Sequence, residues 1–265
     1  MPHDMSTPAF FGRFLVAVLM VICALPVAAQ TDDAAEKTPA DMVYVPAGEF
    51  TMGTNQSEDL GPNTPRFNND ARPEHKVTVA AFYLDKTEVT NAAYKQYCDA
   101  TNYPPPPGWK NGTFPEGQEN FPVMRVSWHE AFAYAAWMGK RLPTEIEWEK
   151  AARGTDARTF PWGNDWDGNR VVTGRDSALQ VGSKPDGASP YGALDMAGNV
   201  YEWTQSWYDA YPDAPVKFAE YNETMKVIRG GGYDYQSIAQ TFYRSVAFPR
   251  TRSDWIGFRC AQDAQ

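Results

Sequence analysis

The sequence predicts a single α+β domain with little regular secondary structure. Three segments carry helix signals, short β-branched runs in the first half predict strands, and no sustained helical period follows residue 155. The later part has five tryptophans scattered among Gly, Pro, Asn and Asp residues: Trp162, Trp166, Trp203, Trp207 and Trp255. A long irregular segment of this kind needs buried rings and satisfied turns to hold its shape. We therefore expect an α+β fold whose second half consists mostly of loops.

Short strands open the domain. Residues 42–46 and 49–52 flank Ala47-Gly48, which predicts two strands and a turn, and residues 76–84 predict another strand. The intervening residues 53–74 are polar and rich in Asn and Pro, and predict a long loop.

Three helix starts are marked by capping residues. Thr90 predicts a helix through about residue 100. Two capping boxes, Ser127 with Glu130 and Thr144 with Glu147, predict helices that end near residues 139 and 154. Each hydroxyl accepts a backbone N–H that has no partner in the first turn.

The first 29 residues are typical of a secretory signal peptide. Arg13 precedes an apolar run over residues 14–25, and small residues follow as far as Ala29. The run is shorter than the ~20 residues that span a bilayer, which disfavours the alternative of a membrane anchor. We expect cleavage before Gln30, a flexible lead over residues 30–41 and one folded domain over residues 42–262. The mature protein is then expected to be periplasmic or secreted, with no stable membrane insertion.

The charge balance narrows the class of partner. The formal net charge is −9, and the two leader charges, Asp4 and Arg13, cancel. An acidic surface disfavours nucleic acid and anionic membranes as partners. A protein, a peptide or a small molecule remains as the expected ligand.

Three ordered blocks resemble the sulfatase-modifying factor family, whose best-known member is the formylglycine-generating enzyme. They are residues 139–149 (Gly-Lys-Arg-Leu-Pro-Thr-Glu-Ile-Glu-Trp-Glu), residues 195–203 (Asp-Met-Ala-Gly-Asn-Val-Tyr-Glu-Trp), and the segments 229–233 (Arg-Gly-Gly-Gly-Tyr) and 257–260 (Gly-Phe-Arg-Cys). The resemblance covers residues 42–261. It implies a C-type-lectin-like architecture.

The family's oxidase binds copper(I) through two cysteines just beyond a Gly-Gly-Ser-Tyr turn and converts a substrate cysteine to formylglycine. Here residues 231–233 read Gly-Gly-Tyr, and no cysteine lies between positions 229 and 259. The family's cysteine positions fall near residues 235 and 239. Because copper(I) prefers soft thiolate ligands, the sequence predicts that copper is not a cofactor and that this oxidation is absent.

The Gly-Asn-x-x-Glu-Trp block predicts a calcium site. Asn199 and Glu202 offer hard oxygen ligands, with carbonyls such as that of Val200 between them. The resemblance implies that these residues hold one calcium ion, and that Asn169 and Asp176, at a shorter spacing than usual, correspond to a second site. The alternative is a set of capped turns that need no metal.

Two cysteines remain after signal cleavage, Cys98 and Cys260. In an oxidising compartment such a pair tends to close, so we weigh a Cys98–Cys260 bridge against two buried thiols. The resemblance implies that the usual partner of Cys260 falls at Ala135, so the family's own bridge is absent.

A further branch of the family consists of iron-dependent sulfoxide synthases. A facial iron site needs two histidines and a carboxylate. The mature chain has His75 and His129, without the added helical domain that supplies ligands in that branch. We expect both imidazoles to be exposed or locally bonded.

The charged and aromatic residues near the family's active site leave two interpretations open. Arginines gather in the last forty residues, and we expect most of them to pair with carboxylates, while one or two could bind an anionic ligand. The first interpretation is a ligand cleft, and the second is that the same side chains fill the vacated site as core. The residues of the proposed cleft are Tyr233, Tyr235, Arg244 and Trp109. Around residues 140–153 we expect an internal ion-pair network or a solvated helix face.

Three functions are consistent with these sequence features. The first is a calcium-stabilised binding or accessory protein without formylglycine-generating activity. The second is a periplasmic oxidoreductase that matures a small exported metabolite such as a siderophore. The third is a lectin-like domain that recognises peptide or glycan.

Overall fold

The computed structural model describes residues 38–55, 70–215, 221–234 and 239–264. The expected signal peptide, most of the expected lead and Tyr235 lie outside these residues. Within the described part, no helix has the length and apolar character needed to cross a membrane.

All three expected helices are present. They are α2 (Asn91–Thr101), α3 (Trp128–Trp137) and α4 (Glu145–Arg153). The hydroxyl of Thr90 accepts the N–H of Ala93 at 3.2 Å, and both expected capping boxes are complete. The helix starts predicted from the sequence are therefore confirmed.

The described strands form three small sheets, with the orders β1-β4-β9, β2-β3 and β7-β6-β5-β8. All pairings are antiparallel except the parallel pair β5 and β8. The strands are β1 (Met42–Val45), β2 (Gly48–Met52), β3 (His75–Val79), β4 (Phe82–Asp85), β5 (Tyr201–Trp207), β6 (Lys226–Arg229), β7 (Ser245–Ala247), β8 (Ile256–Gly257) and β9 (Ala261–Asp263).

The expected strand over residues 76–84 is divided in two. β3 alternates between partly buried and exposed positions and pairs with β2, whereas β4 is almost wholly buried and lies between β1 and β9. Residues 80–81 separate them, because the two halves join different sheets. The prediction of one continuous strand was therefore wrong.

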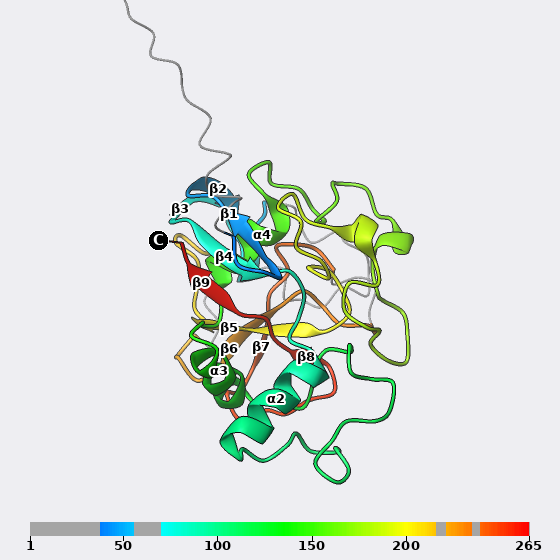
Figure 1. The fold of residues 1–265 in the computed structure, drawn as a ribbon. Coiled ribbons are helices and arrows are strands. Elements are labelled where there is room, and N and C mark those ends of the chain that lie inside the picture. Colours follow the sequence, from blue (N-terminus) through cyan, green and yellow to red (C-terminus); the bar gives the residue numbers. More distant parts are fainter. Residues whose placement is uncertain (1–37, 56–69, 216–220, 235–238, 265) are drawn as a thin grey trace, which may run out of the picture.

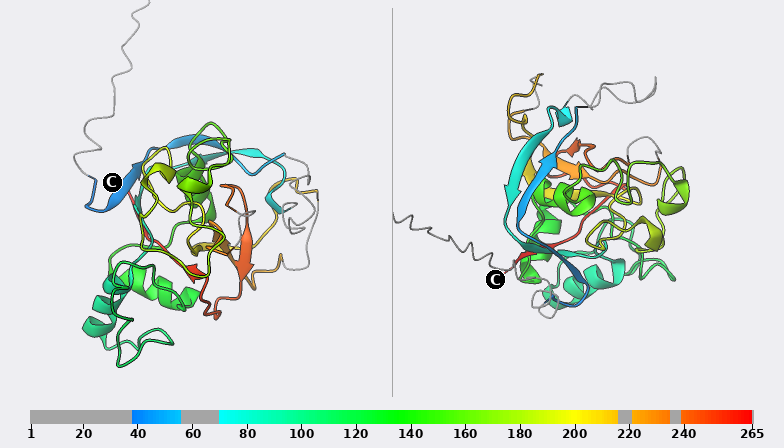
Figure 2. Two further views of the ribbon diagram at one scale, coloured as in Figure 1. Left: turned by 90° about the vertical axis from the view of Figure 1, so that its right-hand side faces the viewer. Right: turned by 90° about the horizontal axis from the view of Figure 1, so that it is seen from above.

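Helix α4 lies at the centre of the domain (Figure 1). It contacts β2 and β3 on one side and β5 and β6 on the other. Its indole Trp148 is completely buried, as is Trp203 on β5. The views in Figure 2 show the first strands as a curved layer along one side of the domain, with α2 and α3 at one end.

Beyond residue 155 the described chain forms strands, turns and two short 3-10 helices, η2 (Gly168–Arg170) and η3 (Pro185–Gly187). Buried rings hold only part of this region: Trp203 is completely buried and Phe258 packs against Tyr134 on α3 with ring centroids 5.4 Å apart, whereas Trp166, Trp207 and Trp255 are exposed, contrary to expectation. The architecture is therefore the α+β fold of low regular content that the sequence predicts.

Candidate functional site

A glycine turn follows β6 and opens the region where the family's oxidase has its cysteines. Gly230 and Gly231 have φ of 97° and 77°, a conformation that side chains rarely adopt. Tyr233, which ends the turn, is 7% exposed and packs with Val172, Ala178 and Val200. Burial, and next the charge of Asp254, raise the pKa of the Tyr233 hydroxyl. The Tyr233 ring is thus largely core.

Arg244 does not line a cleft. It is 2% exposed, and its Nε and Nη2 donate to the two oxygens of Glu145 at 2.7 and 3.0 Å. Nη1 donates to the carbonyl of Asp70 at 2.7 Å, and the guanidinium lies 4.2 Å from the ring centroid of Tyr211. The cleft expected from Arg244 is therefore corrected: this side chain belongs to a buried ion-pair network.

That network joins α4 to β6. Arg229 donates to Glu145 at 2.9 Å and to Glu149 at 2.6 Å, and Arg153 donates to Glu149 at 2.8 Å. All of these side chains are nearly or fully buried. The charged block around residues 140–153 is therefore an internal network, one of the two expected arrangements.

The predicted calcium ligands Asn199 and Glu202 form hydrogen bonds with other side chains and with the backbone. Oδ1 of Asn199 accepts the N–H of Leu179 at 3.0 Å, and its Nδ2 donates to Glu88 at 3.0 Å. Both oxygens of Glu202 accept hydrogen bonds from Arg259 at 2.7 Å, and Oε2 also accepts one from the indole of Trp148 at 2.8 Å. As placed, these side chains do not fit a shared calcium ion, because their oxygens face protein donors.

The remaining predicted metal residues are separate from this pair. Val200 is fully buried in a small core cluster, while Asn169 and Asp176 are exposed. Among the described residues, no three His, Cys, Asp or Glu side chains are placed to hold a metal ion. Calcium stays a prediction for experiment.

Both described cysteines are free. They lie in the same core cluster, but Cys98 contacts the carbonyl of Pro104 at 3.9 Å, whereas Cys260 lies beside Asp85. Burial raises the pKa of both thiols, for Cys260 to well above its ordinary value. In this structure the Cys98–Cys260 bridge is not formed, and both thiols are free and buried.

As expected, the imidazole of His75 is locally bonded and that of His129 is partly exposed. Nδ1 of His75 lies 3.0 Å from the carbonyl oxygen of Pro73, and its ring packs edge-on against Tyr211. His129 is partly exposed on α3 beside the Trp128 ring.

Trp109 lines a hollow of about 190 Å³ that does not include Tyr233 or Arg244, the other described residues of the expected cleft. Arg125 and Asp254 line the same hollow. The indole also packs edge-on against Phe114, with ring centroids 5.4 Å apart. Trp109 and the buried Arg244 are therefore not parts of one site.

A larger pocket, which we call the sheet pocket, has a volume of about 530 Å³ and extends from the end of the glycine turn across the four-stranded sheet. The rings of Phe248 and Trp255 stand 60% and 49% exposed at its rim. Asp234 is the one charged residue among the described residues that line it. The full described lining is Tyr201, Met225, Ile228, Asp234, Ser245, Val246, Ala247, Phe248, Thr251, Ser253, Trp255 and Ile256.

No local sequence pattern predicted this pocket. Its walls come from β5, β6, β7, β8 and the loop after β7, so they meet only through the pairing of strands distant in sequence. The available signal was the pair of apolar rings, Phe248 and Trp255, in a segment otherwise rich in Arg and Ser.

The chain is similar to proteins with named activities. Residues 27–264 match the sulfatase-modifying factor enzyme 1-like domain. The formylglycine-generating enzymes of Mus musculus and Streptomyces coelicolor are each 32% identical, over 84% of this chain and over 75% and 89% of their own lengths. The hercynine oxygenase of Mycolicibacterium smegmatis is 31% identical over 83% of this chain, which spans 61% of that protein.

Solved structures agree on the fold. PvdO from Pseudomonas aeruginosa matches with a TM-score of 0.68 and 31% identity, over 84% of this chain and 94% of PvdO. CarF, at 22% identity and a TM-score of 0.58 over 86% of this chain and 99% of CarF, supports the fold alone. The expected C-type-lectin-like architecture is confirmed. The chain belongs to the sulfatase-modifying factor family.

Proposed function

We propose that this protein is an exported binding or accessory member of its family, and that it holds an apolar or aromatic group of its ligand in the sheet pocket. The pocket begins at Asp234, directly after the glycine turn, and its floor is the face of the four-stranded sheet. A volume of about 530 Å³ suits a small molecule or one to two side chains of a peptide.

The observation that carries this proposal is the exposure of two aromatic rings at one rim. Phe248 is 60% and Trp255 49% exposed, although both border an apolar floor that includes Ile228, Ala247 and Ile256. Single exposed rings are common, but two exposed rings that line one concave apolar surface are typical of a binding site. A ligand that covered them would remove both rings from water.

Cysteine oxidation has no thiol pair to support it. No cysteine lies between residues 229 and 259, and Cys98 and Cys260 are buried in the core and do not line the sheet pocket. The sheet pocket therefore offers shape and aromatic surface rather than soft ligands for copper(I).

Binding of the neutral fluorescent probe N-phenyl-1-naphthylamine tests the pocket. We expect saturable binding to the mature protein. Phe248→Ala and Trp255→Ala should each lower the affinity by about tenfold or more, because each removes a ring that the bound probe would cover. A tenfold loss corresponds to about 1.4 kcal/mol. Trp166→Ala is the matched control, because Trp166 is 44% exposed and does not line the pocket. Absence of binding, or an equal loss in the control, would reject the proposal.

A second candidate is an oxidoreductase that acts on a small exported metabolite. Similarity to a hercynine oxygenase over 83% of the chain favours it. A metal inventory of protein purified from the periplasm distinguishes the two functions: a redox-active metal near one per chain favours the oxidoreductase, whereas calcium alone favours the binding protein. Cell fractionation of the full chain tests export.

A further inference from the structure

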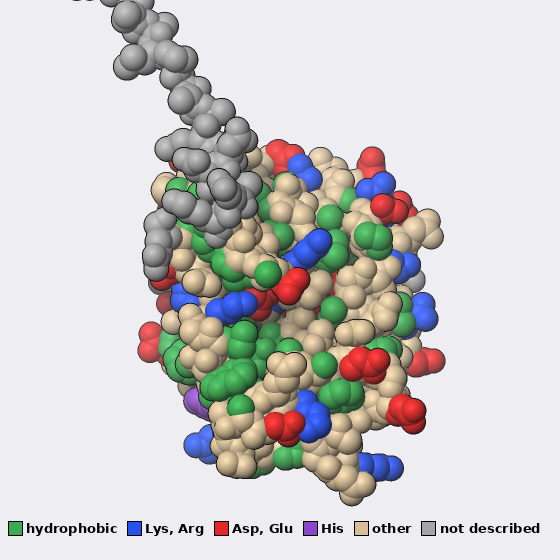
Figure 3. Space-filling model, in the orientation of Figure 1, with side chains coloured by type: hydrophobic (Ala, Val, Ile, Leu, Met, Phe, Trp, Pro, Cys, Tyr) green, Lys and Arg blue, Asp and Glu red, His purple; other side chains and the backbone are tan. Residues whose placement is uncertain are grey.

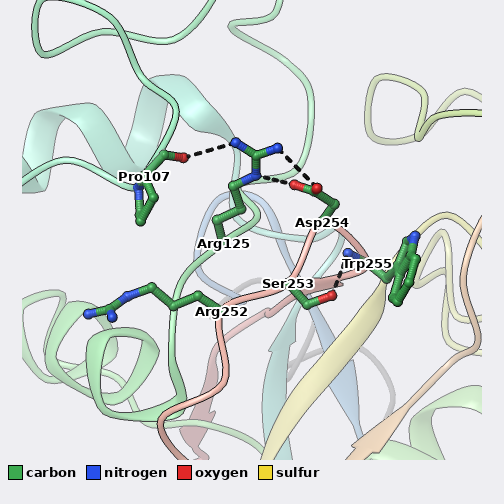
Figure 4. A pocket seen from close by; sticks show the side chains of 6 residues that line it. All are labelled: Pro107, Arg125, Arg252, Ser253, Asp254 and Trp255. Carbon is green, nitrogen blue, oxygen red and sulfur yellow. Dashed lines mark hydrogen bonds and ion pairs between the residues drawn. The ribbon is translucent and has the colours of Figure 1, made fainter.

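A second hollow adjoins the sheet pocket, and two arginines line it (Figure 4). We call it the arginine pocket. Its volume is about 290 Å³, and its lining is Pro107, Arg125, Arg252, Ser253, Asp254 and Trp255. Ser253 and Trp255 also line the sheet pocket. The two hollows therefore lie on either side of a shared wall.

Glu130 holds the Arg252 guanidinium in place through two of its three nitrogens. Its Nε and Nη2 donate to the two oxygens of Glu130, each at 2.8 Å, and Oε2 of Glu130 accepts the N–H and hydroxyl of Ser127 at 2.7 Å. The Arg252 side chain is 45% exposed, and no described residue accepts a hydrogen bond from its Nη1. The guanidinium is thus oriented by a capped helix while one edge faces solvent.

Arg125 is oriented in a similar way. It pairs with Asp254 through Nε and Nη2, and its Nη1 reaches the carbonyl of Pro107 only at 3.4 Å. Its backbone has φ of 59°, and its N–H donates to the carbonyl of Ser253 at 2.9 Å. In Figure 4 both arginine side chains extend to one side of Ser253 and the Trp255 ring lies on the other.

We infer that the arginine pocket binds the carboxylate of a ligand whose apolar group occupies the sheet pocket. Each guanidinium at the hollow is paired with one carboxylate, Arg252 with Glu130 and Arg125 with Asp254, and Nη1 of Arg252 is left to donate to a ligand. A planar guanidinium with oriented N–H groups matches a carboxylate well. The ligand class is an apolar free acid: an acylated amino acid, or the C-terminal residue of a peptide. This inference rests on the proposed function, because it assigns the neighbouring subsite of the same ligand.

A matched pair of probes tests it. N-acetylphenylalanine and N-acetylphenylalaninamide share the ring and differ in the carboxylate. We expect both to shift the indole N–H signal of Trp255 in 15N-labelled mature protein, and the acid to bind at least about tenfold more tightly, as charge-assisted hydrogen bonds are stronger than neutral ones. The peptide Ala-Ala-Phe with a free C-terminus separates the two sources of acid, since a peptide ligand predicts tighter binding than the single residue.

Three variants test whether the preference for the acid over the amide depends on Arg252. Arg252→Gln should reduce the preference for the acid to less than about threefold while it leaves the amide affinity intact, because the loss is one of charge-assisted donors. Glu130→Gln should widen the preference, because glutamine still serves the capping box and no longer neutralises Arg252. Arg250→Gln should change nothing, since Arg250 is exposed and does not line the pocket.

The outcomes separate this inference from the proposed function. Equal affinity of acid and amide, or an unchanged preference in Arg252→Gln, would overturn the carboxylate subsite and leave the sheet pocket standing. Failure of both probes to bind would overturn the two together. The amide affinity of each variant reports directly that its pocket is folded.

Discussion

Glu202 and Arg259 form a fully buried bidentate ion pair between β5 and the segment that precedes β9. Two N···O distances of 2.7 Å join them, and both side chains are 0% exposed. Arg259 also donates to the backbone carbonyls of Asp85, Lys86 and Leu194. This pair therefore connects the Gly-Asn-x-x-Glu-Trp block to the first strands, so the block acts as a structural connector.

Glu202→Ala should destabilise the protein by about 3–5 kcal/mol, because it leaves the Arg259 guanidinium buried and unpaired. Chemical denaturation measures the loss, with Glu119→Ala as control at an exposed acid. Chemical denaturation and thermal melting of both proteins, each with and without chelator, decide the calcium prediction. If Glu202 acts only as the ion-pair partner of Arg259, the loss in the free energy of unfolding is the same with and without chelator. If it holds calcium, chelation lowers the melting temperature of the wild-type protein and has no effect on the variant.

Arg244→Gln should also destabilise by about 3–5 kcal/mol, because Glu145 would lose both of its bonds to this guanidinium. Arg250→Gln, at an exposed position, is the control. The affinity of the folded fraction for N-phenyl-1-naphthylamine should not change. A variant with normal stability and weakened binding would contradict this account and show that Arg244 contacts the ligand.

Thiol labelling tests the two free cysteines. In the native mature protein we expect very slow reaction with an aromatic disulfide reagent, and two equivalents of thiol after unfolding without reductant. Because burial raises both thiol pKa values, a shift to mildly alkaline pH should not accelerate native labelling. Cys98→Ala should leave one equivalent. Absence of thiol in the unfolded wild-type protein would show that the bridge forms.

The ionisation of Asp70 should make the free energy of unfolding depend on pH, and the raised pKa of this carboxyl sets the direction of that dependence. Burial, the largest cause, raises its pKa from 3.8 to about 6, although Arg244 and the Tyr208 hydroxyl oppose the change. The folded state therefore binds a proton more tightly than the unfolded state, and the associated stability is complete below about pH 4 and lost as pH rises through about 6.

The comparison with Asp70→Asn isolates this effect. Between pH 4 and 7 the free energy of unfolding of the wild type should fall relative to the variant by roughly 3 kcal/mol, since one pKa unit corresponds to about 1.4 kcal/mol. Denaturation of both proteins across this range measures it. A constant difference, or a free energy of unfolding of the wild type that rises relative to the variant with pH, would place an ordinary carboxylate at Asp70.

Local signals in the sequence predicted local structure well. Thr90, Ser127 and Thr144 set the three helix starts, because a cap depends on residues within one turn. The single strand expected over residues 76–84 failed, because its interruption depends on which partner strands lie alongside. Pairing of that kind cannot be read from one segment.

The site was harder to predict for the same reason. Arg244 looks like a cleft residue in sequence, but its burial depends on Glu145, which lies 99 positions away in the chain. The sheet pocket is assembled from β5, β6, β7 and β8, whose order no local pattern encodes. On the face shown in Figure 3, the acidic and basic side chains of the described residues are interspersed.

The central claim is that this family member does not carry out the cysteine oxidation of the formylglycine-generating enzymes. Mass spectrometry of a sulfatase-derived cysteine peptide, incubated with the mature protein and copper(I), tests it most directly, with the Streptomyces coelicolor formylglycine-generating enzyme as positive control. We predict that the peptide keeps its cysteine under conditions in which the control converts it. Copper-dependent formation of formylglycine by this protein would contradict the claim.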